Sequence, residues 1–294
     1  MNRTMNRPNR REVAVPPSSW FPPALWVKAL FEARLLLFAE MIAIIVFGTI
    51  YVWLASQVDL RALGMFLRAL PATFERVAGV PFRSIATPEG RLAMFFVDPA
   101  TALVAASWSI ARGSDCISGE IGRGTMELLL AQPVHRVAIV VVQAIVTTGG
   151  AALIALSTWL GIWLGIQVTG FAAQIELTRF MPSAMNLFGL MFFLAAFSTL
   201  VSAFGRDRRR TVGLSTGFYL AQVLMKVIAQ AAPTFGWLRY GTFLGAFEPQ
   251  SLAIYPETAW AELAWRNGCL IGLGIAAYAA AAAVFSSRDI PAPL

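Results

Sequence analysis

The chain has few charged residues, few cysteines, one histidine and two lysines, and each shortage excludes a class of site. Only 13% of its 294 residues are charged, against about 25% in a soluble domain. Cys116, Cys269 and one histidine allow neither a disulfide framework nor a Cys/His metal cluster. Both lysines follow an apolar residue, so the Gly-Lys step of a phosphate-binding P-loop is absent. We therefore assign no catalytic, cofactor-binding or metal-binding residue, and any ATP hydrolysis must belong to another chain.

Apolar residues are abundant instead, and their distribution predicts a membrane protein. They make up 57% of the sequence, and the mean hydropathy is +0.66. A helix that spans a bilayer needs about 20 mostly apolar residues. Six stretches meet this requirement: 35–56, 92–111, 137–168, 184–204, 211–232 and 268–286. We predict an all-α fold with six membrane-spanning helices.

Several local features refine this prediction. The basic, proline-rich residues 1–23 are expected to be disordered, and residues 24–294 to form one transmembrane domain. Residues 20–34 mix aromatic and charged side chains, which predicts an interface helix before the first span. Asp98-Pro99 interrupts the second span. The third stretch is too long for one crossing, so its first turns are expected to form a stalk.

Basic residues set the predicted orientation. With a cytoplasmic N-terminus, the inner segments carry 14 Lys and Arg in 73 residues and the outer segments 8 in 85. The positive-inside rule then places both termini in the cytoplasm of a bacterial-type plasma membrane. The Arg206–Arg210 cluster is explained by orientation and by lipid phosphate, without nucleic acid. Outside, segments 57–91 and 233–267 are long, and the second carries an aromatic belt at Trp237, Tyr240, Trp260 and Trp265.

The one long polar stretch in the middle of the chain is 119–136. Thr125 occupies an N-cap position, Glu127 suits the first turn of a helix, and Pro133 should end that helix. The result is a helix of about two turns, which is too short to be stable alone. Met126, Leu129 and Leu130 share one face at helical spacing. We expect that face to need a partner, either the membrane surface or another protein.

This stretch, GEIGRGTMELLLAQPVHR, resembles the signature of the permease subunits of type-2 ABC exporters. Ser286-Ser287-Arg288-Asp289 also looks like relatives, whereas His135 departs from the small polar residue often found there. The resemblance implies a cytosolic coupling helix between spans two and three, a separate ABC ATPase that holds ATP and Mg, and a permease homodimer or pair. It implies no substrate. The coupling residues so implied are Glu120, Arg123, Gly124, Thr125, Met126, Glu127, Leu129, Leu130, Pro133 and Arg136.

Other functions stay open. The alternative is an ATP-independent channel or carrier, for which the ionisable residues inside spans are candidates: Glu40, with Lys28 or Arg34 as its partner, Asp98 and Lys226. Interfacial positioning explains each of them as well. Gly213-x-Ser215-x-Gly217 fits a hydrolase elbow but lacks a strand–turn–helix context. Glycines four residues apart instead predict close packing of helices three, five and six, within the subunit or across a dimer: Gly161, Gly165, Gly213, Gly217, Gly268 and Gly272.

Overall fold

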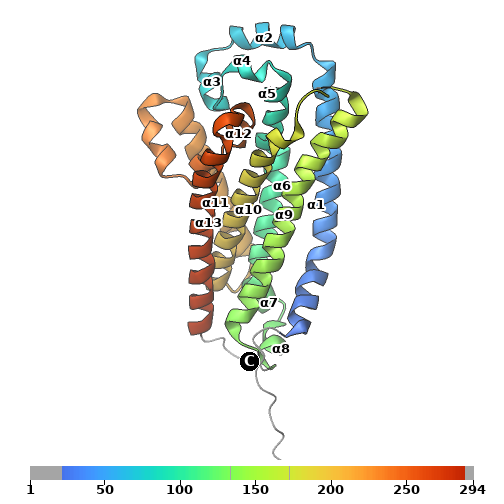
Figure 1. The fold of residues 1–294 in the computed structure, drawn as a ribbon. Helices are drawn as coiled ribbons and strands as arrows, with labels where there is room; N and C mark the ends of the chain where they lie inside the picture. The colour runs from blue at the N-terminus through green and yellow to red at the C-terminus, as the bar shows by residue number, and fades with distance from the viewer. Residues whose placement is uncertain (1–21, 133, 172, 289–294) are drawn as a thin grey trace, which may run out of the picture.

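The computed structural model describes residues 22–132, 134–171 and 173–288. This part of the chain is helical and contains no strand. Six helices or helix stacks in it are long and apolar enough to cross a membrane, as the sequence predicts: Pro23–Gln57, Pro88–Gly122, Arg136–Thr169, Leu177–Phe204, Arg208–Ala231 and Pro256–Ser287. They stand side by side as an elongated bundle (Figure 1). We call the end that carries the short helix α8 (Met126–Leu130) the near end, and the opposite end the far end.

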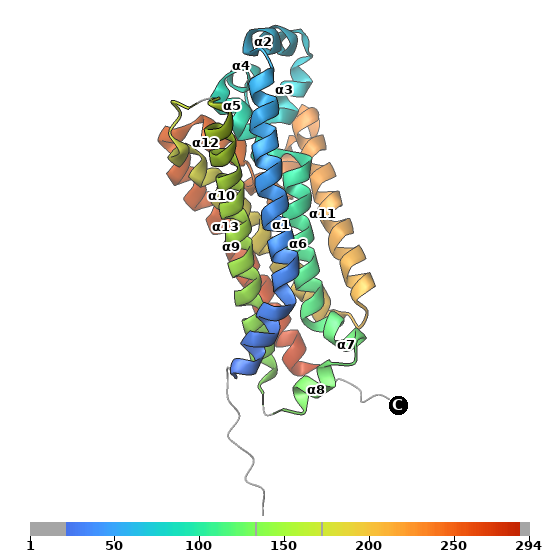
Figure 2. The same cartoon turned by 90° about the vertical axis from the view of Figure 1, so that its right-hand side faces the viewer.

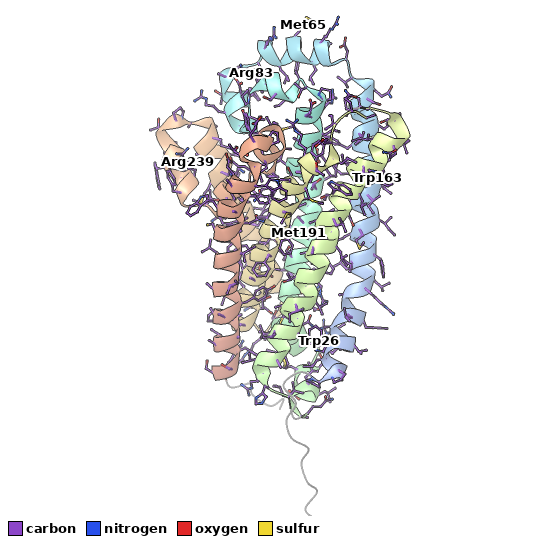
Figure 3. The ribbon with its side chains drawn as sticks, in the orientation of Figure 1. Trp26, Met65, Arg83, Trp163, Met191 and Arg239 are labelled. Carbon is purple, nitrogen blue, oxygen red and sulfur yellow. The ribbon has the colours of Figure 1, made fainter. Side chains whose placement is uncertain are left out.

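Helix α10 (Met181–Phe204) occupies the centre of the bundle. It packs against α13 (Pro256–Ser287), α6 (Pro99–Ser114) and α9 (Arg136–Thr169). Met191, at mid-height in Figure 3, is fully buried. Helix α1 (Pro23–Gln57) packs mainly on α9, whereas α11 (Arg208–Ala231) lies on the outside, with only Thr211 and Ser215 buried (Figure 2).

The second membrane crossing is a stack of short helices. It consists of α5 (Pro88–Ala93), the 3₁₀ turn η1 (Met94–Val97), α6, the π-helical turn η2 (Asp115–Gly119) and α7 (Glu120–Gly122). The predicted interruption at Asp98-Pro99 is confirmed. Asp98 accepts a hydrogen bond from the amide of Ala100 at 2.9 Å, and Pro99 begins α6, because proline suits the first turn of a helix.

Short helices cover the far end. They are α2 (Leu60–Ala69), α3 (Ala72–Ala78) and α4 (Phe82–Ile85) after α1, and η3 (Leu177–Phe180) before α10. The turns η4 (Pro233–Tyr240) and η5 (Phe243–Ala246) and the helix α12 (Pro249–Ile254) connect α11 to α13. The η4 turn forms a lobe beside the bundle, where Figure 3 labels Arg239. Segment 57–91 is therefore built mainly of short helices.

Two predicted boundaries are wrong. Residues 23–34 do not form a helix of their own, since α1 continues from Pro23 to Gln57 without a break. The last span begins at Pro256, so Trp260 and Trp265 lie on α13 and not in a loop. Both errors have one cause: charged residues lower the hydropathy of these first turns, but no helix breaker separates them from the apolar run. The predicted disorder of residues 1–23 falls largely outside the described residues.

Glycine allows α9 to approach α1 closely. A Cβ atom on Gly161 would lie 3.1 Å from the carbonyl oxygens of Ile44 and Ile45, and one on Gly165 would lie 2.6 Å from the Cβ of Val52. At these two glycines the close neighbour of α9 within the described protomer is thus α1, and not the fifth or sixth spanning helix. The other predicted packing glycines would have no atom within 4 Å of an added Cβ, so they make no close packing within the described protomer: Gly213, Gly217, Gly268 and Gly272.

Candidate functional site

The short helix α8 lies at the near end, between α7 and α9 (Figure 2). Gly124 turns the chain into it with φ +71°, a left-handed conformation that glycine adopts without strain. The helix has five residues, Met126–Leu130, and is shorter than predicted. Thr125 does not cap it: its hydroxyl donates instead to Glu120 Oε2 at 2.6 Å. Pro133, the predicted stop, lies outside the described residues.

The apolar face of α8 points into the protein. Met126 is 1% exposed, and Leu129 and Leu130 pack against the same core cluster as Leu25 and Ile139. The prediction that this face needs an outside partner is therefore wrong. The opposite face is free in the protomer, with Leu128 70% exposed, and it also presents Glu127, Ala131 and Gln132. A partner that approaches the near end meets these four side chains.

Glu120 ties this segment to the rest of the bundle. Its side chain is 1% exposed, and it forms ion pairs with Lys28 on α1 and, at 2.9 Å, with Arg123. Lys28 also pairs with Glu32, one turn along α1, at 2.7 Å. Because Glu120 also accepts the Thr125 hydroxyl, one buried carboxylate joins α1, α7 and the start of α8.

Asp115 is a second anchor in the same region. Its Oδ1 lies 2.6 Å from Arg123 and 3.3 Å from Arg208, the first residue of α11. Partial burial lowers the pKa of Arg123, but the hydrogen bond and charge of Asp115, together with Glu120, outweigh burial and raise it above its ordinary value. The guanidinium thus stays charged and links both carboxylates.

The π-helical turn η2 directly precedes α7 and is held by a serine from α10. Ser202 Oγ accepts the amides of Ile117 and Ser118 at 3.2 and 2.8 Å and donates to the carbonyl of Ser114 at 3.1 Å. A π turn frees backbone groups from the regular ladder, and such turns are frequent at functional sites. Here the Ser202 hydroxyl satisfies the freed amides, so the π turn is a stable part of the connection between α6 and α8.

The exit from the segment is anchored as well. Arg136, the first residue of α9, donates to the carbonyl of Arg288 at 2.5 Å. Arg288 in turn donates to the carbonyls of Ala203 and Gly205 at 2.7 and 3.0 Å. The near ends of α9, α10 and α13 are therefore joined.

The three candidate charges inside spans have separate local partners. Glu40 accepts a hydrogen bond from the Ser107 hydroxyl at 2.6 Å. The predicted pairing of Glu40 with Lys28 or Arg34 is therefore wrong, and Lys28 forms ion pairs with Glu32 and Glu120 instead. Asp98 caps α6, as described above. Lys226 donates to the carbonyl of Phe247 at the far end. No hydrogen bond or ion pair joins any two of these three residues in the part of the chain that the structure describes.

Ser215 does not sit in a hydrolase elbow. It lies within α11, is fully buried, and its hydroxyl is 3.3 Å from that of Ser198. His135 lies at the near end, just before α9. A nucleophile elbow needs an exposed serine between a strand and a helix, so the match of Gly213-x-Ser215-x-Gly217 to that motif is a coincidence.

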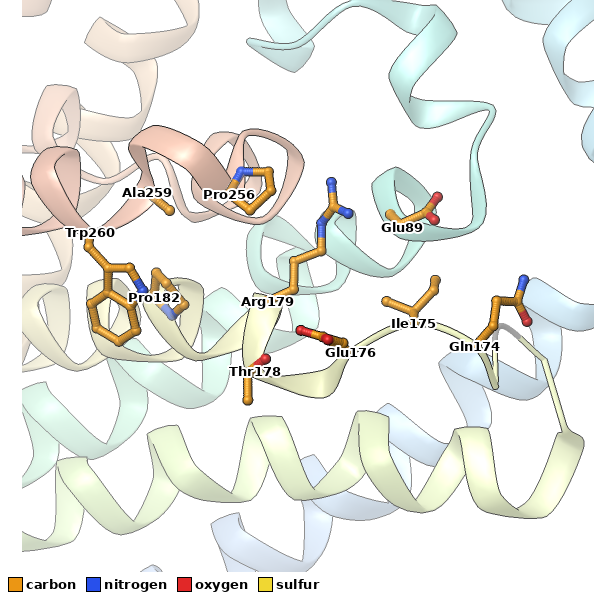
Figure 4. Close-up of a pocket in the computed structure, with 10 residues that line it drawn as sticks. All are labelled: Glu89, Gln174, Ile175, Glu176, Thr178, Arg179, Pro182, Pro256, Ala259 and Trp260. Atoms are coloured by element: carbon orange, nitrogen blue, oxygen red, sulfur yellow. The ribbon is translucent and has the colours of Figure 1, made fainter.

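A cavity of about 410 Å³ opens at the far end between α5, η3 and α13 (Figure 4). Its lining includes two carboxylates, Glu89 and Glu176, and the ring of Trp260. Arg179 also lines it and donates to the carbonyls of Ala253 and Ile254 at 2.6 and 3.0 Å. The arginine therefore joins η3 to α12.

Comparison with known families identifies the family of the chain. The family model of the ABC-2 family transporter proteins matches residues 43–255. The chain belongs to this family. The match covers more than half of the chain. It includes α8, the ion pairs of Asp115 with Arg123 and Arg208, and the ion pair of Glu120 with Arg123. A search of curated proteins found no match.

Membership of the ABC-2 family makes the chain a multi-pass membrane transport component and an ABC-type permease. The family also implies that the permease pairs with an ABC ATPase subunit. The sequence analysis did not assign Leu128, Lys28, Asp115 and Arg208 to the region around α8. A signal for the ion pairs was available in the sequence. The three segments that contain these residues carry opposite charges, and the positive-inside rule assigns all three to one side of the membrane.

Proposed function

We propose that this chain is the membrane-spanning subunit of an ATP-driven exporter, in which a separate ATPase subunit hydrolyses the ATP. We further propose that the ATPase subunit binds to α8. The observation that carries the proposal is the division of α8 into two faces. Met126 is buried in the protomer, while Leu128 on the opposite side is 70% exposed. A helix held on one side and open on the other is suited to receive a partner.

The connections of α8 give the contact a mechanical meaning. Glu120 and Arg123 link the segment to α1 and, through Asp115, to α11. Arg136 links its exit to α13 and α10. Displacement of α8 by a closing ATPase pair would therefore be passed to helices on both sides of the bundle, as a shear of packed elements. In this proposal the near end and both termini face the cytoplasm, and ATP and Mg are bound by the ATPase.

Two substitutions test the contact. The chain is co-expressed with the ABC ATPase encoded beside it, and Leu128→Asp and Glu127→Arg are each assayed for co-purification and for transport-dependent ATPase stimulation. We expect both to weaken the complex about tenfold or more, because each introduces a mismatched charge into the contact, which costs more than the roughly 1.4 kcal/mol that corresponds to a factor of ten. Neither substitution should change the folded protomer, since both side chains are exposed.

Matched controls lie at the far end. Met65→Asp alters a side chain of similar exposure, 68%, on α2, and Glu257→Arg alters another first-turn glutamate, on α13. Both should leave the complex intact. Full association and full ATP-dependent transport in the Leu128 and Glu127 variants would refute the contact. Transport by the chain without any ATPase would favour a channel or carrier.

The proposal includes two copies of the chain in one transporter. Support comes from α11. Only 6% of its most apolar 18-residue stretch is buried, and Gly213 and Gly217 face open space. Small residues at this spacing allow two helices to approach closely in a membrane. Mass measurement of the detergent-purified chain should give a dimer, and Gly217→Leu should reduce it while Gly149→Leu, at an open position on α9, should not. An unchanged dimer in both variants would exclude α11 as the contact.

A further inference from the structure

A second cavity at the far end has a charge opposite to that of the cavity in Figure 4. It measures about 620 Å³, within the range of small-ligand sites, and lies between α3, the end of α11 and the η4 lobe. Three cationic side chains line it, Arg76, Lys226 and Arg239, and Glu248 is the one carboxylate among its described lining residues. Each cation comes from a different element, so folding brings the charges together.

The one carboxylate does not neutralise these cations. Glu248 forms an ion pair at 3.1 Å with Arg266, which is not among the lining residues. In the described part of the chain, the Arg76 side chain forms no hydrogen bond or ion pair, and the Arg239 guanidinium donates to the hydroxyl of its neighbour Tyr240 and lies over that ring. Lys226 donates to a neutral acceptor, the carbonyl of Phe247. Three positive charges thus face one cavity whose one described carboxylate is shared with Arg266, and the lining keeps a net positive charge.

The position of the cavity indicates where its ligand comes from. Lys226 lies about one and a half turns before the end of α11. The neighbouring η4 turn exposes Trp237 by 66% and Tyr240 by 79%. Exposed Trp and Tyr beside the end of a spanning helix are typical of the level of lipid headgroups. The cavity therefore opens where the apolar part of the membrane ends.

We propose that this cavity binds a phosphate-type anion, which Arg76, Lys226 and Arg239 hold together. Two guanidinium forks and one ammonium group match an anion with several oxygen atoms better than they match a single carboxylate. The same chemistry occurs in a phospholipid headgroup and in a free phosphate. The site goes beyond the proposed permease role and does not depend on it, because it lies at the end opposite α8 and its occupancy needs no ATPase.

The test uses the purified full-length chain in detergent and native mass spectrometry to count bound molecules. The probes are phosphatidylglycerol, phosphatidylcholine and inorganic phosphate. Phosphatidylglycerol should be retained in preference to phosphatidylcholine. Arg76→Gln combined with Arg239→Gln should weaken its binding about tenfold or more, since two charge-assisted contacts are lost. Arg61→Gln combined with Arg68→Gln removes two far-end cations on α2, outside the cavity, and should change nothing.

The remaining arms identify the source of the anion and guard against misfolding. Displacement of phosphatidylglycerol by millimolar phosphate would assign the site to free anions, and resistance would assign it to a lipid; both support the site. If the paired variant unfolds at a lower temperature than the wild type, Arg239→Gln alone replaces it, because that side chain is exposed. Equal retention in wild type and Arg239→Gln or paired variants, or equal loss in the α2 control, would overturn the proposal.

Discussion

Lys28 on α1 forms an ion pair with Glu120, although 92 residues separate them in the sequence. The pair crosses from the start of the first spanning helix to the last turn before α8. The Glu120 side chain is 1% exposed, while that of Lys28 is 30% exposed. The carboxylate is thus the buried member, and its charge is the one that folding has to compensate.

Neutralising Glu120 should therefore destabilise the near end. Glu120→Gln leaves Lys28 and Arg123 without their common anion, and we expect a loss of about 1–3 kcal/mol. Thermal unfolding in detergent measures it. Glu127→Gln is the control, because Glu127 is exposed on α8 and forms no ion pair with any described residue. Equal unfolding temperatures for the two variants would show that the pair contributes nothing.

The two faces of α8 predict opposite consequences for adjacent leucines. Leu129→Asp places a charge against the core cluster of Ala29 and Ile139 and should cost the protomer about 1–3 kcal/mol. Leu128→Asp should change protomer stability by less than about 0.5 kcal/mol, because its side chain is exposed. Unfolding of the isolated chain compares them. A larger loss at Leu128 would mean that α8 is rotated relative to the bundle.

The approach of α9 to α1 can be tested with two glycines of one helix. Gly161→Leu would push a side chain into the backbone carbonyls of Ile44 and Ile45, and overpacking of this kind costs about 1–3 kcal/mol. At Gly149 the added Cβ would meet nothing within 4 Å, so Gly149→Leu should be tolerated. The amount of folded protein after heating in detergent distinguishes them. Comparable losses would mean that the helix, rather than the contact, is sensitive.

Asp98 can be assigned a role by comparing two substitutions. If it acts only as the N-cap of α6, Asp98→Asn should keep both stability and transport, because the amide oxygen also accepts from Ala100. Asp98→Ala should cost about 1 kcal/mol. Thermal unfolding and transport are measured together. A transport defect in a stable Asp98→Asn variant would instead assign the carboxylate to the pathway.

The spans could be predicted from the sequence, but the partners of their polar residues could not. Each span contains an apolar run long enough to cross a bilayer, and Asp98-Pro99 marks a break by its own chemistry. Which side of α8 faces the protein could not be predicted, because the core of the same chain and a foreign surface accept Met126 and Leu129 equally well. Lys28 cannot reach Glu40, because twelve residues of the continuous helix α1 separate them by about 18 Å. Its pairing with Glu120 depends on how α1 is placed and rotated beside α7. No local pattern carries that information.

The sparse covering of α11 has a consequence for motion. Its two buried residues lie in its first eight positions, and its first residue is bound by Asp115. At its other end it contacts the short elements η4, η5 and α3. Its middle packs on the core through Phe218 and Tyr219, but moving it would expose fewer buried residues than moving α9 or α10, which would open the core. Among the six spanning helices of the described residues, α11 thus has the smallest buried share, and it is attached directly, through Asp115 and Arg123, to the segment that carries α8.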